Sequence, residues 1–209
     1  MVHFPIGIYK EQVTVIKKYK PNSLQELKEL VSDKSVHLGD IDTSLITDMT
    51  ELFKDSTRKN FDGLETWDTS NVTTMERMFH RAKYFNHPIG NWDVSSVTNM
   101  ECIFCGCSNF NQPLDHWDVS NAKDMAYMFC KATSFRQPIT AWRLCGQSTK
   151  GMFLRLPDYR DIESRVMCLT PHDEEAMRYD LEDMIGIFGE EAVQDALRLY
   201  GPKYGLKED

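Results

Sequence analysis

Three closely spaced cysteines are the first residues in this sequence whose types and spacing could support chemistry. Cys102, Cys105 and Cys107 form a Cys-x-x-Cys-x-Cys pattern, and thiolates at such spacing can bind zinc. A zinc-dependent structural or catalytic module is therefore one hypothesis. The sequence offers neither a second Cys-x-x-Cys nor a pair of histidines that would complete the ligand set. We therefore predict no metal site and no cofactor.

Four aspartates, each starting an Asp-x-Ser pattern, are a second candidate for chemistry: Asp42, Asp68, Asp93 and Asp118. Stacked carboxylates repel one another and could hold a cation between them. The same pattern is typical of a turn in which the carboxylate accepts the backbone N–H two residues later. We favour the turn, because it needs no ligand.

Motifs of the common enzyme classes are missing from the sequence. His172-Asp-Glu-Glu lacks the second histidine, four residues after the first, that the metalloprotease motif requires. There is also no glycine-rich phosphate loop, no Gly-x-Ser-x-Gly elbow and no evident Cys–His pairing. We therefore predict that the protein is not an enzyme.

A repeat of 25 residues organises the middle of the chain. Its four tryptophans lie at this interval, which is the signature of stacked structural units. Phenylalanines and prolines keep the same phase. The phased residues are Trp67, Trp92, Trp117 and Trp142, with Phe85, Phe110 and Phe135, and Pro88, Pro113 and Pro138.

Within each unit, Met-x-x-Met-Phe places apolar groups at positions i, i+3 and i+4, which predicts a short helical turn. The Phe-Asn-x-Pro-Ile-x-x-Trp segment predicts a short strand with a turn. Stacked units would then bury these groups in one continuous core. Cys105 and Cys130 share a phase with His80, and Cys107 shares one with Ala82 and Ala132. Small, half-buried coil positions therefore explain these cysteines as well as zinc would.

The unit resembles the short repeat class of the BspA-like leucine-rich-repeat surface proteins, over about residues 36–156. The segments 117–121, Trp-Asp-Val-Ser-Asn, and 110–114, Phe-Asn-Gln-Pro-Leu, carry the resemblance. It implies a leucine-rich-repeat-like solenoid used for binding, usually at a cell surface. We accordingly expect an α/β repeat fold, a short solenoid of about five coils with a strand–helix cap before it and helices after it.

The flanking segments are expected to cover the two ends of the stack. Residues 1–35 would form an N-terminal cap, with a strand at 13–16 and a helix starting at Ser23, where Ser23-x-x-Glu26 is a capping box. Residues 157–209 contain two predicted helices, one starting at Thr170-Pro171 and a second from Glu190 to Tyr200, separated by Gly189. These helices could cap the last coil, form a homodimer or hold a partner, and we favour capping.

The net charge of −8 is concentrated in the C-terminal segment, because 157–209 holds fourteen acidic and six basic residues. Such a balance argues against direct nucleic-acid binding. The acids form either a solvated helix face or a docking surface for a basic partner. The candidate docking residues are Asp173, Glu174, Glu175, Asp180, Glu182, Asp183, Glu190 and Glu191.

These patterns lead to two functional hypotheses. The first is a non-catalytic protein–protein interaction module that uses the acidic tail and a polar column on the repeat. The alternative is an acidic inhibitor, such as an anti-CRISPR-type protein, that blocks a nucleic-acid enzyme. The polar column consists of Asn86, His87, Asn111, Gln112, Arg136 and Gln137. These side chains could instead hydrogen-bond the turn backbone from coil to coil.

The expected location is the cytoplasm. The longest apolar runs span only a handful of residues, too few for a membrane helix. The first eight residues lack the basic-then-apolar layout of a signal peptide. The six cysteines are then expected to be reduced thiols.

Overall fold

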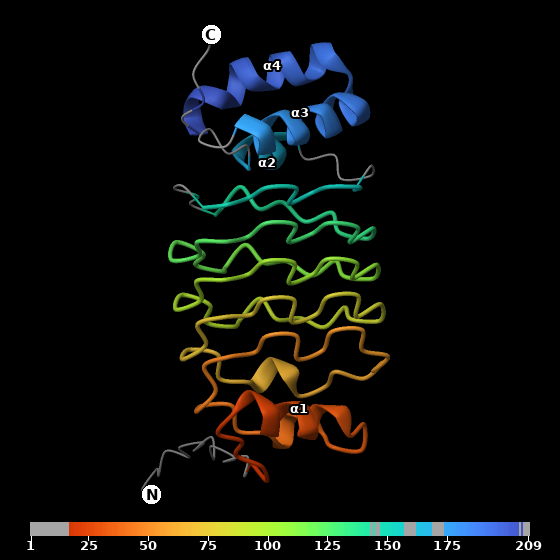
Figure 1. Ribbon diagram of the computed structural model, residues 1–209, viewed down its shortest axis with the longest axis vertical. Helices are drawn as coiled ribbons and strands as arrows, with labels where there is room; N and C mark the ends of the chain where they lie inside the picture. Colours follow the sequence, from red (N-terminus) through yellow and green to blue (C-terminus); the bar gives the residue numbers. More distant parts are fainter. Residues whose placement is uncertain are drawn as a thin grey trace, which may run out of the picture.

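The computed structural model describes residues 17–142, 144, 147–156, 162–168, 174–204 and 206. Figure 1 shows a column in which the repeats lie as stacked coils, with helices at both ends. The strand predicted at 13–16 and the helix start predicted at Thr170-Pro171 lie outside the described residues. Within the described part of the chain, no helix combines the length and the apolar character needed to cross a membrane.

Neighbouring coils are joined by isolated parallel bridges rather than by strands. No residue that the structure describes belongs to a β-strand. The predicted fold class is therefore wrong: the chain is not an α/β leucine-rich-repeat-like solenoid with a strand–helix cap. The bridges within the repeat pair Asp48 with Thr74, Thr74 with Asn99, Asn99 with Asp124, and Asp124 with Ser148.

The physical reason lies in the segment that was predicted as a helical turn. Arg77 and Arg81 adopt left-handed conformations, with φ of 54° and 56°, which interrupt both a helix and a strand. Every second residue donates its N–H to the carbonyl three positions back, as Met78 does to Met75 at 3.1 Å. The N–H groups of the residues between them donate to carbonyls of the next coil. These inter-coil donors in one unit are Met75, Arg77, Phe79 and Arg81.

The predicted strand after this segment is also absent from the described coils. Phe85 donates its N–H to Ala82 at 3.0 Å, and Trp92 donates to Ile89 at 3.1 Å. The backbone at both ends of the segment is therefore used in local turns. Pro88, which has no N–H, cannot supply a bridge between them.

The continuous core predicted from the repeat is confirmed. The rings of Phe79, Phe104 and Phe129 stack along the column, with successive centroids 5.8 and 5.7 Å apart. A second column runs beside it, where the centroids of Phe85 and Phe110 are 5.5 Å apart. Offset stacking of this kind adds to the free energy gained from burying the rings.

At the N-terminal end, α1 (Leu24–Ser32) covers the first coil. The Ser23 hydroxyl accepts the Glu26 N–H at 3.3 Å, which confirms the predicted cap. Leu27 and Val31 are buried in the core. The buried Arg58 guanidinium donates to the Val31 carbonyl at 3.2 Å, so a side chain from the first coil satisfies the end of this helix.

Two short 3₁₀ helices, η1 (Leu38–Asp40) and η2 (Leu64–Thr66), lie between α1 and the first complete coils. Both end where a repeat phase begins, because Ile41 and Trp67 follow them directly. They contact each other across neighbouring coils. The earliest coils are thus less regular than the later ones.

The C-terminal end is covered by α2 (Ile162–Met167), α3 (Glu174–Phe188), α4 (Glu190–Tyr200) and η3 (Gly201–Tyr204). Figure 1 shows α2 and α3 next to the last coil and α4 farther out. Met184, Val193 and Ala196 form a small core between α3 and α4. The predicted break at Gly189 and the predicted second helix are confirmed, whereas α2 was not predicted.

Candidate functional site

An open groove of about 250 Å³ lies beside the first coils of the repeat. It is smaller than the roughly 300–1,000 Å³ of typical small-molecule sites, which favours a side chain or short peptide as its occupant. Its lining combines an aromatic ring, a cation, a carboxylate and amides. The lining residues are Lys59, Asn60, Phe61, Asp62, Tyr84, Asn86 and His87.

Tyr84 is the exposed aromatic group of this groove, with 39% of its surface accessible. Two ammonium groups lie near its ring: Lys59 Nζ at 5.3 Å and Lys83 Nζ at 5.6 Å from the centroid. Both distances allow cation–π attraction. The ring thus has two positive charges near it, an arrangement suited to an acidic group that approaches beside an apolar one.

His87 lines the groove and contacts the Glu65 carboxylate. Its Nε2 lies 2.5 Å from Glu65 Oε2, and the same carboxylate oxygen accepts the Gly63 N–H at 3.0 Å. Burial raises the pKa of Glu65, but the hydrogen bonds from His87 and the backbone outweigh it and leave the pKa below its ordinary value. The carboxylate is therefore charged and fixed.

The predicted polar column is brought together, but its amides are occupied between coils. Asn86 Oδ1 accepts the Asn111 N–H at 2.9 Å and the Gln112 amide at 3.0 Å. One coil later, Asn111 Oδ1 accepts the Arg136 N–H at 2.9 Å and the Gln137 amide at 3.2 Å. These side chains replace the backbone bridges that this face lacks, as the coil-to-coil interpretation predicts.

The structure separates the predicted acidic docking residues into two groups. Asp180 on α3 contacts Gly151 of the last coil, and Asp183 on α3 contacts Arg165 of α2. Glu182, Glu190 and Glu191 are exposed. Asp173 lies outside the described residues, and of Glu174 and Glu175 only the backbone, in the first turn of α3, is described.

The phased aspartates form turns, as predicted. Asp68 Oδ1 accepts the Ser70 N–H at 3.1 Å, and Asp93 Oδ1 accepts the Ser95 N–H at 3.0 Å. The hydrogen bond from Ser95 keeps the pKa of Asp93 below its ordinary value. Within the described ranges, no three His, Cys, Asp or Glu side chains are grouped so that they could hold a metal ion.

A family model described as "Mycoplasma protein of unknown function, DUF285" matches residues 47–161, more than half of the chain. The chain belongs to the DUF285 family. The matched segment contains the coils and the Tyr84 groove and ends just before α2. No significant match was found among the curated proteins or among the solved structures.

The DUF285 segment also holds a contact among cysteines. Cys105 lies near Cys102 on its own coil and near Cys130 on the next, and both neighbours shift the pKa of its thiol. Cys107 lies deeper and donates to the Phe79 carbonyl at 2.7 Å. Burial raises the pKa of its thiol, so this cysteine serves as a core residue.

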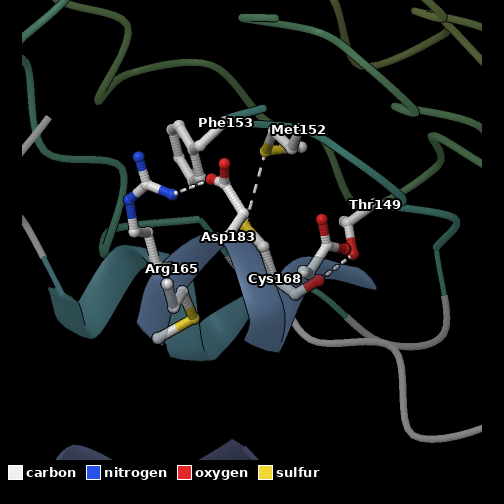
Figure 2. Close-up of a pocket in the computed structure, with 8 residues that line it drawn as sticks. Thr149, Met152, Phe153, Arg165, Cys168 and Asp183 are labelled. Carbon is white, nitrogen blue, oxygen red and sulfur yellow. Dashed lines mark hydrogen bonds and ion pairs between the residues drawn. The ribbon is translucent and has the colours of Figure 1, made fainter. Parts of the chain in front are cut away.

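A second, much smaller cavity lies where the DUF285 segment meets the C-terminal helices, shown in Figure 2. Its volume of about 10 Å³ holds one water molecule at most. Arg165 donates to Asp183 at 3.0 Å, and the Thr149 hydroxyl donates to the Cys168 carbonyl. These contacts make the cavity a packing junction rather than a ligand site.

Sequence reasoning found His87 and Asn86 but missed the rest of the groove. Lys59 and Tyr84 occupy positions that vary between the repeat units, so no periodic signal marks them. The sequence signal for this groove was a tyrosine, an aromatic residue with a polar hydroxyl, next to a lysine in Lys83-Tyr84. Glu65 lies two residues before Trp67. Its role in fixing His87 is evident only from the contact between the two side chains in the folded protein.

Proposed function

We propose that this DUF285 protein is a non-catalytic protein-binding module that docks a partner segment in the Tyr84 groove. The observation that carries this proposal is the exposed Tyr84 ring with Lys59 and Lys83 beside it. Tyrosine is enriched in interfaces and among their hot spots, and the two ammonium groups add charge recognition to the apolar contact of the ring.

The rigid surroundings of the groove support the proposal. Phe61 beneath it is buried and packs edge-on against Phe85, with centroids 4.9 Å apart. His87 is fixed by Glu65. A site on rigid elements loses little conformational entropy when it binds, which favours affinity from a small contact area.

The chemistry of the groove defines the partner as a segment that carries an acidic residue next to an apolar or aromatic one. The acidic residue would lie near the two lysines, and the apolar one against Tyr84. The resemblance of the repeat to BspA-like proteins, which implies binding, agrees with this role. We place the module in the cytoplasm, where its cysteines would remain thiols.

A peptide-display selection against the full chain tests the proposal. We expect enrichment of peptides with the acidic–apolar pattern. Their affinity should fall at least about tenfold with Tyr84→Ala, which corresponds to about 1.4 kcal/mol. Tyr19→Ala is the matched control, because Tyr19 does not line the groove and has nearly the same exposure, 38%, so this substitution should leave affinity unchanged.

Two results would count against the groove. Selected peptides that bind the Tyr84→Ala variant as tightly as the unsubstituted chain would exclude it as the docking site. Loss of binding on Glu190→Ala with Glu191→Ala, rather than on Tyr84→Ala, would instead favour the acidic inhibitor hypothesis.

A further inference from the structure

A chain of three thiols crosses two neighbouring coils, at Cys102, Cys105 and Cys130. The Cys102 thiol donates to the Glu101 carboxylate, 3.8 Å from its sulfur. Cys105 lies near both other cysteines, since Cys102 and Cys130 each shift the pKa of its thiol.

The coil stack holds Cys105 and Cys130 directly beside each other. The two residues have the same phase on neighbouring coils, and the Gly106 N–H donates to the Cys130 carbonyl at 2.8 Å. The adjacent residues Phe104 and Phe129 have centroids 5.7 Å apart. Disulfides join Cα atoms that lie about 4.4–6.8 Å apart, so the spacing of the stack suits a bridge at this position.

Cys130 has the most acidic thiol of the three, although the residue is only 6% exposed. The hydrogen bond from Cys105 lowers the pKa of its thiol despite burial, and Lys131 and Arg155 add positive potential. Cys105 accepts from Cys102, which lowers its pKa, but donation to Cys130 and burial raise it to about 11. Hydrogen bonding to Cys105 and burial raise the pKa of Cys102. The thiolate forms first at Cys130, and thiolates are the nucleophiles.

We propose that Cys130 and Cys105 form a hydroperoxide-reactive dithiol that closes into a disulfide between two neighbouring coils. The Cys130 thiolate attacks one peroxide oxygen, the O–O bond breaks, and the leaving oxygen takes up a proton as water or an alcohol. Cys130 is then a sulfenic acid. The Cys105 sulfur attacks the Cys130 sulfur, an S–S bond forms, and the departing hydroxide leaves as water with the Cys105 proton.

The resulting bridge would tie two coils together covalently, and cellular thiols would reduce it again. In a reducing compartment such bridges are transient and responsive to oxidants. The inference is independent of the Tyr84 groove, because it concerns different coils and a different reaction.

The test uses the reduced full chain with hydrogen peroxide near stoichiometric amounts, followed by alkylation after denaturation. We expect a mass loss of about 2 Da and the loss of two alkylatable thiols, as formation of one disulfide requires. Trypsin then places Cys130 in the peptide 124–131 and Cys105 in the peptide 84–123. A crosslink between these two peptides is the expected product, with fragmentation locating it at Cys105.

Serine variants separate this pair from other combinations. Cys102→Ser should retain the bridge, and Cys130→Ser should abolish it. Cys105→Ser should leave a sulfenic acid on Cys130 that dimedone traps. A bridge between Cys102 and Cys105, or a folded chain whose thiols all survive the peroxide, would overturn the proposal, with circular dichroism confirming that each variant is folded.

Discussion

The Asp180 carboxylate of α3 accepts the backbone N–H of Gly151 in the last coil, at 3.0 and 3.2 Å from its two oxygens. One coil earlier, the equivalent N–H of Tyr127 donates to the Lys150 carbonyl at 2.8 Å. A side chain of α3 therefore takes the place of the next coil. This contact ends the stack and satisfies a donor that would otherwise be left unpaired.

This relationship predicts a pH-dependent junction. Burial raises the pKa of Asp180 to about 6. Because the folded-state pKa lies above the ordinary 3.8, the contribution of Asp180 is fully present below pH 3.8 and is lost as pH rises through about 6. Asp180→Asn, which keeps an acceptor oxygen for Gly151, should remove this dependence.

The measurement is urea unfolding of both proteins between pH 4 and pH 7.5. The difference in unfolding free energy should shift in favour of the asparagine variant as pH rises, by on the order of 2 kcal/mol. Asp183, Arg165 and Lys150 also act on Asp180 and remain in both proteins. Parallel pH profiles for the two proteins would refute the assignment.

The indole N–H groups of successive tryptophans donate to backbone carbonyls of the preceding coil. Trp92 Nε1 donates to the Leu64 carbonyl at 3.2 Å, and Trp117 Nε1 donates to the Ile89 carbonyl at 3.0 Å. Trp117→Phe should destabilise the protein by about 2–4 kcal/mol, because it leaves a buried carbonyl without its donor and opens a cavity. Urea denaturation measures the loss, and a loss below about 1 kcal/mol would show that the carbonyl finds another partner.

Gly63 is a position where the stack requires the absence of a side chain. Its φ is +91°, and an added Cβ would lie 2.2 Å from the Gly39 nitrogen and 2.5 Å from the Gly39 Cα. Gly63→Ala should therefore cost about 3 kcal/mol or more, since backbone atoms must move. Gly186→Ala is the matched control: no atom lies within 4 Å of the added Cβ, and helix propensity should add about 1 kcal/mol of stability. Thermal unfolding of the two variants should shift in opposite directions.

Arg165 joins the C-terminal helices to the last coil. Its guanidinium donates to Asp183 at 3.0 Å and to the Leu156 carbonyl at 2.8 Å, and it lies 5.6 Å from the Phe153 ring centroid. Arg165→Leu should cost about 3–5 kcal/mol, because it leaves a half-buried carboxylate without its cation.

The double variant Arg165→Leu with Asp183→Leu tests that reason. Removing both charges should recover part of the loss, whereas a purely additive result would show that the ion pair does not carry the effect. Hydrogen exchange in α3 is the appropriate measurement, because it detects local opening of these helices separately from global unfolding.

Predictability differed between the repeat and its flanks. The 25-residue phase was readable because the same apolar residues recur at each coil and must stack to be buried. The cap at Ser23 and the break at Gly189 were readable because they depend on local chemistry. The short α2 carried no comparable local signal, and its position depends on the contacts of Arg165.

The candidate site was predictable only in part for a related reason. Asn86 and His87 belong to the repeating column, so their phase placed them together. Lys59 and Tyr84 are 25 residues apart, yet neither belongs to a repeated type. Their proximity follows from the coil stack itself.

By itself, the sequence determined the period of the repeat, the composition of the core and the concentration of acids in the last segment. Only the tertiary structure decided the backbone conformation of the coils. Arg77 and Arg81 adopt left-handed conformations because alternate N–H groups must reach the next coil. Their own N–H groups donate to the Glu101 and Cys105 carbonyls, both at 2.8 Å. Local propensity favours a helix or a strand at these positions, and pairing between coils overrides it, since buried N–H groups need partners.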